Sequence, residues 1–439
     1  MSEYVENIVA DSLEDLKKQI IRKEGKVKVE IRNPVNMDDR TFSFKIRSLD
    51  FYRQMITEIR FPISGNLNSS EDGKMLLHRK ENGLLTLERT FGELEHAEVP
   101  CGVDVIGTRA FENSVISVFL PDTVSIIEDS AFQNCSRLKE IRMPKCLKKI
   151  GRNAFEGCES LKNIQIPDEV EEIDEYAFNG CRKLSEAELP EKIRKVDFCT
   201  FSDCLSLQRV VLKKNVKYIS DKAFLNCANL SDILLPEGLK FIGYESFFGC
   251  VNINHLKLPA SLELLSVRGL IGVQAVEISK PIPQLGQALM GKTNGGKGCF
   301  SVIFADKTLI FPREMGWDAM EKVSDVLENI GEMEPGVHSY YKLATKTEIK
   351  QETAWESFRL SHNEEIGKYL RRCAAAMLSE KAEKGEKPFT KLFVSMSKEK
   401  ILTEAAAKKA FKISQEKGWA VATDKILQIM EERKKEKEK

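Results

Sequence analysis

Residues 161–181 of the chain read LKNIQIPDEVEEIDEYAFNGC, and variants of this stretch recur on both sides of it. Seven phenylalanines mark the recurrence, and those from Phe132 to Phe247 are spaced 23 residues apart: Phe111, Phe132, Phe155, Phe178, Phe201, Phe224 and Phe247. A fixed period of about 20 to 50 residues indicates a solenoid, in which each repeat forms one coil of a stack. Solenoids present long surfaces to partners, so we look for a binding face before a catalytic cleft.

Each unit predicts two short strands and a compact turn. Ile164 and Ile166 alternate with polar residues, which is the period-2 pattern of a half-buried strand. Pro167 ends this strand because it has no N–H to donate. Val170 and Ile173 mark a second short extended segment, and the Ala-Phe step then forms a turn. Stacking such coils produces parallel strand ladders.

The slot two residues after each phenylalanine supports this interpretation. It holds only Asn, Gly or Asp, the residues that tolerate a left-handed backbone at the end of a turn. Its members are Asn113, Asn134, Gly157, Gly180, Asp203, Asn226 and Gly249.

Six of the 11 cysteines occupy one slot of the repeat. They are Cys135, Cys158, Cys181, Cys204, Cys227 and Cys250. One thiol per coil at the same position is typical of a small buried hydrophobe. Since no C-x₂-C pair occurs, we expect neither a zinc site nor a disulfide scaffold.

The repeated string L-x-x-I-x-I-P-x-x-V-x-x-I-x-x-x-A-F-x-x-C resembles the BspA-type leucine-rich repeat family over residues 97–259. The resemblance implies a right-handed solenoid with a parallel strand ladder and a role in binding proteins or surfaces. Many members of the family are exported to the cell surface. The start of this sequence, MSEYVENIVADSLEDLKKQI, does not read as a secretory signal. We therefore expect a cytoplasmic protein, or a cell-surface one if an export signal precedes this sequence.

The flanking regions predict a cap on each side of the solenoid. Residues 1–95 contain a helical spacing of apolar residues from Val5 to Ile21 and strand-like runs at 26–31 and 41–46, which indicate an α+β cap. The solenoid is assigned to 96–280, a capping loop and strand to 281–310, and an all-α domain to 311–439. The expected fold class is thus α/β: a leucine-rich-repeat solenoid between these two flanking parts.

Charge excludes some classes of function. The 439 residues contain 67 basic and 67 acidic side chains, a balance that gives no support to nucleic-acid binding. No stretch is apolar for the roughly 18 residues that a membrane helix needs, so membrane insertion is not expected. The oligomeric state stays open.

Two patterns could carry chemistry. Gly286–Thr293 satisfies the P-loop spacing G-x₄-G-K-[ST], but Asn-Gly-Gly-Lys-Gly follows it instead of a helix, so a nucleotide-binding switch is the weaker alternative. Glu186 and Glu188 lie two apart on one strand and could bind or act on a glycan. A charged solenoid face would look the same. We expect no enzyme, no cofactor and no metal.

The expected function is protein binding along the outward side of the strand ladder. The outward slots lie on either side of the buried central residue of each strand: Ser117, Phe119, Glu140, Arg142, Asn163, Gln165, Glu186, Glu188, Arg209, Val211, Asp232, Leu234, His255 and Lys257. Apolar side chains amid charged ones are typical of a protein-binding face. Three basic and four acidic residues give this strip a net charge near −1, which disfavours nucleic acid.

Overall fold

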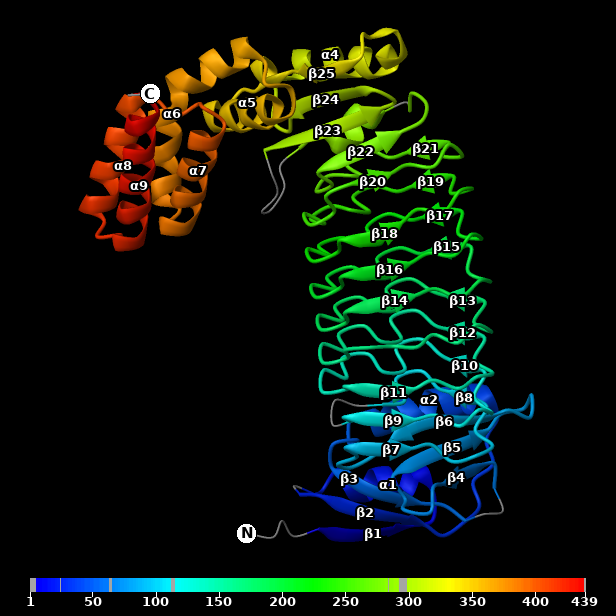
Figure 1. The fold of residues 1–439 in the computed structure, drawn as a ribbon. Helices are drawn as coiled ribbons and strands as arrows, with labels where there is room; N and C mark the ends of the chain where they lie inside the picture. Colours follow the sequence, from blue (N-terminus) through cyan, green and yellow to red (C-terminus); the bar gives the residue numbers. More distant parts are fainter. Residues whose placement is uncertain are drawn as a thin grey trace. The chain divides into compact units, whose positions relative to one another are not determined.

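The structure is a computed structural model that describes residues 5–23, 25–62, 65–111, 115–282, 284–291 and 298–437. The chain divides into two compact units, one up to Val273 and one from Gln274 onward (Figure 1). The boundaries expected at residues 95 and 310 lie inside these units and stay predictions.

The first unit begins with a cap in which helices and strands alternate: β1 (Glu6–Ala10), α1 (Leu13–Ile20), β2 (Val27–Ile31), α2 (Asp39–Asp50) and β3 (Ile56–Arg60). The three strands are parallel, in the order β1-β2-β3. Three antiparallel strands follow: β4 (Leu67–Ser69), β5 (Met75–Arg79) and β6 (Leu85–Thr90). Strand β6 pairs in parallel with the first coil, so the cap covers that end of the stack.

Two details expected inside the cap are wrong. The helix expected from Val5 begins at Leu13, and the segment expected as a strand at 41–46 lies within α2. Helix N-caps explain both differences. The Ser12 hydroxyl accepts a hydrogen bond from the Asp15 amide at 3.2 Å, and the Asp38 carboxylate accepts one from the Thr41 amide at 2.8 Å.

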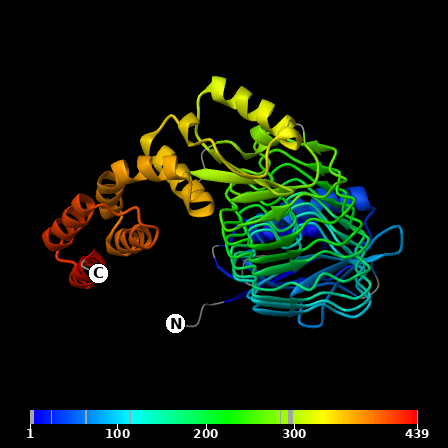
Figure 2. The same cartoon turned by 45° about the horizontal axis from the view of Figure 1, so that its top comes forward.

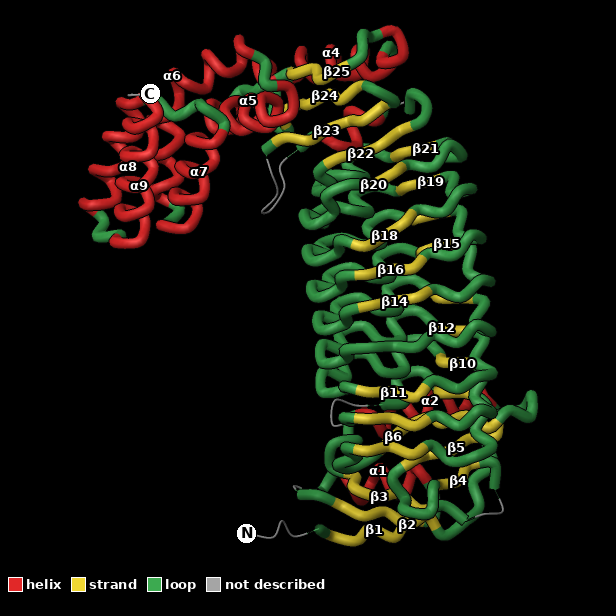
Figure 3. Tube along the Cα trace, viewed as in Figure 1, coloured by secondary structure: helices red, strands yellow, loops and turns green. Residues whose placement is uncertain are grey.

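The solenoid carries two parallel ladders, confirming the predicted architecture (Figures 1 and 3). We call the first the recognition ladder: β7 (His96–Glu98), β9 (Ser117–Phe119), β11 (Glu140–Arg142), β14 (Glu186–Glu188), β16 (Arg209–Val211), β18 (Asp232–Leu234) and β20 (Leu256–Lys257). We call the other the second ladder: β8 (Val105–Ile106), β10 (Ile126–Ile127), β12 (Lys149–Ile150), β13 (Glu172–Ile173), β15 (Lys195–Val196), β17 (Tyr218–Ile219), β19 (Phe241–Ile242) and β21 (Leu264–Leu265). Figure 2 shows the coils stacked one behind the next.

The phenylalanine column forms the core of the stack. The rings lie parallel, with neighbouring centroids 4.5–5.7 Å apart. From Phe132 to Phe247 the column is completely buried. The slot two residues later is left-handed at every described member, with φ between 57° and 81°, as predicted. Asn113 lies outside the described residues.

Each turn contains a second residue with left-handed backbone conformation. The residue types at this position did not predict it. It lies two residues before each phenylalanine, with φ between 52° and 59°: Arg109, Ser130, Asn153, Tyr176, Cys199, Lys222 and Glu245. In this conformation the backbone amide can donate to the next coil, as from Ser130 to the carbonyl of Arg152 at 2.7 Å. The bond between coils offsets the strain of a left-handed non-glycine residue.

The repeat also continues one coil beyond Phe247, the last phenylalanine of the column. Leu270 lies where the next phenylalanine would be, Val273 takes the cysteine slot, and both are completely buried. Gly272 occupies the left-handed slot with φ 122°. The sequence pattern did not reveal this coil because Leu270 and Val273 replace the phenylalanine and the cysteine that mark the other turns.

The cysteine column is structural. Within the described residues none of the six forms a disulfide, and all six are completely buried. From Cys158 onward each Sγ donates to the carbonyl of the phenylalanine one coil earlier, at 3.0–3.3 Å. Burial also raises the thiol pKa well above its ordinary value, as at Cys158 and Cys181.

These thiols should resist alkylation in the folded protein. Thiolates, not thiols, react, and the column is both buried and protonated at neutral pH. We expect iodoacetamide to label Cys101 and Cys146, which are exposed, while the six column residues stay unlabelled until the protein unfolds. Peptide mass spectrometry checks this, and labelling of Cys181 at the rate of Cys146 would show that the column is accessible.

The second unit combines a sheet with helices. Its strands are β22 (Ala275–Ile278), β23 (Cys299–Phe304), β24 (Lys307–Pro312) and β25 (Gly336–Ser339), adjacent in that order. Its helices are α3 (Leu285–Leu289), α4 (Trp317–Glu328), α5 (Thr347–Ser361), α6 (Glu364–Glu383), α7 (Glu386–Lys398), α8 (Glu404–Glu416) and α9 (Ala420–Lys437). The helical C-terminal region is confirmed. It also contains one strand, β25, which the expected all-α domain did not include.

The last two helices form a hairpin. Helices α8 and α9 pack together, and Gly418, with φ 67°, lies in the turn between them. One apolar core joins α5 to α9 and includes Leu370, Phe389 and Phe393.

Candidate partner-binding site

Eleven of the fourteen predicted outward residues lie on strands of the recognition ladder, and the other three, Asn163, Gln165 and His255, lie in segments without strand structure. In β14 and β18 the central residue is buried and its two neighbours are exposed, as the alternation requires. Across the predicted set only Ser117 and Val211 are half-buried, and the others are exposed. Leu234 is 79% exposed, the largest exposed fraction among the apolar residues of this face.

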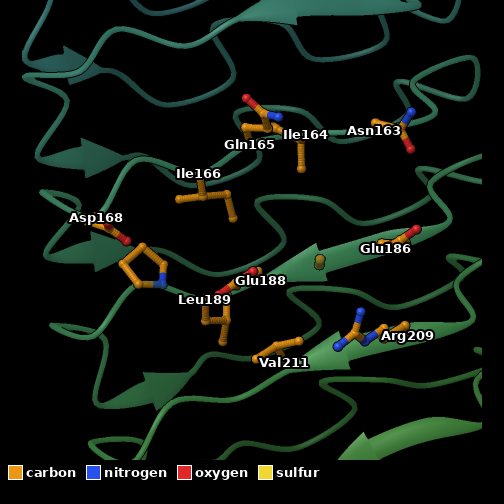
Figure 4. Close-up of a pocket in the computed structure, with 12 residues that line it drawn as sticks. Asn163, Ile164, Gln165, Ile166, Asp168, Glu186, Glu188, Leu189, Arg209 and Val211 are labelled. Atoms are coloured by element: carbon orange, nitrogen blue, oxygen red, sulfur yellow. The ribbon is translucent and has the colours of Figure 1, made fainter.

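Three pockets lie over this face. The first, of about 640 Å³, is lined by residues of three coils, including Asn163, Gln165, Glu186, Glu188, Arg209 and Val211 (Figure 4). The second, of about 500 Å³, includes Glu140, Arg142, Asn163 and Gln165. The third, of about 370 Å³, includes Ser117, Phe119, Glu140 and Arg142. The structure thus brings these predicted residues together, while Asp232, Leu234, His255 and Lys257 line none of the three.

The ladder is interrupted where the first two pockets meet. Strand β11 pairs with β9 and β14 pairs with β16, but within this described part of the stack residues 163–165 form no strand between them. Asn163 and Gln165 line both pockets and form their common wall. The next coil carries Ala187 where its neighbours carry Ile164 and Val210, so the buried central side chain is smaller there.

Contacts between coils hold several of these side chains. Arg209 Nε lies 3.1 Å from the Asp232 carboxylate, and the guanidinium of Arg142 lies 4.4 Å from the ring centroid of Phe119. Glu188 accepts a hydrogen bond from Lys213, which raises the pKa of that lysine. All of these groups remain near solvent, where single ion pairs add little to stability. Their role is to orient the outward side chains.

Sequence reasoning missed four charged residues of the first two pockets, and Glu98 of the third. Lys139, Lys145 and Lys162 line the second pocket, and Asp168 lines the first. Lys139 and Lys162 lie just before the outward slots and Lys145 and Asp168 just after them, so a count restricted to two positions per strand leaves them out. The signal that could have found them is the 23-residue repeat itself, which places Lys139 and Lys162 in the same slot of adjacent coils.

The chemical alternatives gain no support from the site. Glu186 and Glu188 are both exposed on an open face. In the P-loop match, Gly286 to Leu289 belong to helix α3 instead of forming a loop before a helix, and Lys292 and Thr293 lie outside the described residues. Among the described residues, no group of three or more His, Cys, Asp or Glu is placed to hold a metal. No helix in that part of the chain is long and apolar enough to cross a membrane.

The repeat region matches a known family. Residues 89–168 and 148–268 match the BspA type leucine-rich repeat region, in 6 copies, which confirms the resemblance drawn from the repeat. No curated protein matches the sequence.

Several solved structures are similar to parts of the chain. A leucine-rich cell surface protein from Faecalibacterium prausnitzii is 26% identical, over 51% of this chain and 75% of its own, with a TM-score of 0.42. A leucine-rich repeat protein from T. pallidum is 28% identical, over 45% of this chain and 93% of its own, with a TM-score of 0.41. One from Bacteroides ovatus is 22% identical, over 53% of this chain and 76% of its own, with a TM-score of 0.38.

Proposed function

We propose that this protein is a non-enzymatic scaffold that binds a protein partner along the recognition ladder. The observation that carries the proposal is the coincidence of the three pockets with outward slots selected from the repeat alone. Inward slots hold similar residues from coil to coil because packing demands it, whereas the outward slots differ in every coil. Variable side chains on a rigid, repetitive frame suit recognition of one partner across several coils.

The chemistry of the face also supports a protein over other partners. The exposed Leu234 and Phe119 lie among charged groups, a combination found in protein interfaces. A nucleic acid would need a uniformly basic surface, and this face carries both signs. We also place the protein in the cytoplasm, because exposed free thiols such as Cys101 and Cys146 suit a reducing compartment.

Replacing Arg209 and Leu234 together with alanine should weaken partner capture at least tenfold, about 1.4 kcal/mol. Arginine is enriched among interface hot spots, and a few residues usually dominate binding. Both side chains are exposed, so the melting temperature should stay within a few degrees of wild type. The measurement is quantitative pull-down from the source cell, followed by a titration with the captured protein.

The matched control is Glu171→Ala with Glu172→Ala. These residues are also exposed and also lose ion pairs, to Lys192 and Lys149. The control should bind normally because it lies on the second ladder. The proposal would be contradicted if partner capture were unchanged by the Arg209 and Leu234 substitutions but lost with the Glu171 and Glu172 substitutions.

A further inference from the structure

The second pocket is strongly basic. Four cations line it, Lys139, Arg142, Lys145 and Lys162, against the single carboxylate of Glu140. All four are exposed, and within the described part of the chain none has a carboxylate at salt-bridge distance. The pocket therefore presents cations that no described acidic side chain neutralises directly.

The first pocket has the opposite sign. Asp168, Glu186 and Glu188 line it with one cation, Arg209, which is already paired with Asp232. Lys213 contacts Glu188, but Asp168 and Glu186 have no cation at salt-bridge distance among the described residues. This pocket can accept a positive charge from outside the chain.

Several charges elsewhere on the solenoid are compensated by a partner in the next coil. On and beside the second ladder, opposite charges meet from coil to coil, as in Lys149 with Glu172 at 2.8 Å and Lys240 with Glu263 at 2.9 Å. Lys139 and Lys162 also share one slot of neighbouring coils, but among the described residues neither has a carboxylate at salt-bridge distance. Like charges in adjacent positions of a stack are destabilising. The uncompensated positive charge of the second pocket therefore favours an external anionic group.

We propose that the recognition ladder binds an extended peptide segment carrying acidic residues on one side and basic residues on the other. The acidic part would lie in the basic pocket and the basic part in the acidic pocket. The inference rests on the proposed function and specifies the chemistry of its partner. A uniformly charged polymer fits less well, because one of the two pockets would repel it.

The geometry also sets the spacing of the charges. Glu140 and Glu186 lie on coils two steps apart, which is about 10 Å at the usual separation of strands. An extended chain spans about 3.3 Å per residue, so the opposite charges of the ligand should be about three residues apart. Asn163 and Gln165, at the common wall, offer amide donors and acceptors for the backbone between them.

Fluorescence anisotropy with four labelled synthetic peptides tests this. The first contains Glu-Glu-Ser-Thr-Lys-Lys between neutral residues, the second separates the same charges by eight neutral residues, and the others replace all charges with Glu or with Lys. We expect the first peptide to bind at least tenfold more tightly than each of the others. We also expect its affinity to fall steeply with added salt.

The variant Lys139→Glu with Lys162→Glu should weaken binding of the first peptide at least tenfold and should prefer the all-Lys peptide. The control, Lys148→Glu with Arg194→Glu, makes the same change of charge at exposed positions beside the second ladder and should bind within twofold of wild type. Since all four positions are exposed, a melting curve verifies that each variant is folded. Lys139→Gln with Lys162→Gln replaces the first variant if charge reversal unfolds it.

An all-Glu peptide that binds as tightly as the mixed one would overturn the inference in favour of an acidic ligand, such as a nucleic acid or an acidic glycan. Equal affinity for the two mixed-charge peptides would contradict the expected separation of about three residues between opposite charges. If no peptide binds, the inference that the ladder recognises a peptide carrying both charges is wrong. None of these results decides the proposed function, which is tested separately by capture of the cellular partner with the Arg209→Ala and Leu234→Ala variant.

Discussion

Phe178→Ala should lower the free energy of unfolding by about 3–5 kcal/mol, the usual cost of removing a buried aromatic side chain. The ring is completely buried and stacks between Phe155 and Phe201, with centroids 5.5 and 5.4 Å away. Its own carbonyl accepts from the Cys204 thiol at 3.2 Å, so a shift of the turn would disturb the next coil as well. The substitution would leave a cavity in the middle of the stack. Because coils pack on both sides of it, the neighbouring side chains cannot easily move in to fill this cavity.

Chemical denaturation followed by circular dichroism measures this loss. Phe51→Ala is the control, because Phe51 is 87% exposed and should change stability by no more than about 0.5 kcal/mol. A Phe178→Ala protein as stable as the control variant would show that the column is not the core of the solenoid.

Gly243→Ala should also be costly, by about 1–3 kcal/mol, the usual range for an overpacked interior. A Cβ at this position would lie 2.5 Å from the Asp221 amide nitrogen and 2.6 Å from the Ser220 carbonyl carbon. These are backbone atoms of the preceding coil, so the coils must separate. That separation would break the hydrogen bond that the Asp221 carboxylate accepts from the Tyr244 amide at 2.7 Å.

The same slot one coil later supplies the control for this glycine. Ser266 already carries a Cβ there, so Ser266→Ala should stay within about 0.5 kcal/mol of wild type. Thermal melting of both variants checks the difference. Equal melting temperatures would mean that the coils are not held as closely as the structure places them.

The columns of the solenoid could be predicted because each coil repeats the same packing problem. Phe178 and Cys181 recur with period 23, so their neighbours in space are their own equivalents one coil away. The same logic extends to the Arg209–Asp232 ion pair, whose partners share one slot. It does not extend to Lys213 with Glu188, since that contact joins different slots and depends on side-chain reach.

The cap could be predicted only in outline, because its elements do not repeat. The run from Thr41 to Ile46 alternates like a strand, but the Asp38 cap and the surrounding packing make it helical. Tertiary context overrode local propensity there. Asp38 is an N-cap residue type that can be recognised in the sequence. It could have indicated a helix, but the alternating pattern that follows favoured a strand.

The candidate face was predictable as a set of positions but not as a shape. Alternation around Ala187 identifies Glu186 and Glu188 as outward, and both are exposed. The interruption of the ladder at 163–165, which joins the two pockets, has no counterpart in the repeat pattern. Whether a strand forms at 163–165 depends on the distance between adjacent coils. The small side chain of Ala187 is one of several side chains that set this distance.

Hydroxyl-radical footprinting of the protein with and without its captured partner tests the central claim most directly, because both ladders can be compared within one molecule. Leu234 and Phe119 are 79% and 37% exposed on the recognition ladder, while Leu264 and Tyr218 are 51% and 45% exposed on the second. We expect the partner to protect Leu234 and Phe119 from oxidation and to leave Leu264 and Tyr218 unchanged. Protection of the second pair without the first, or of neither, would contradict recognition by this face.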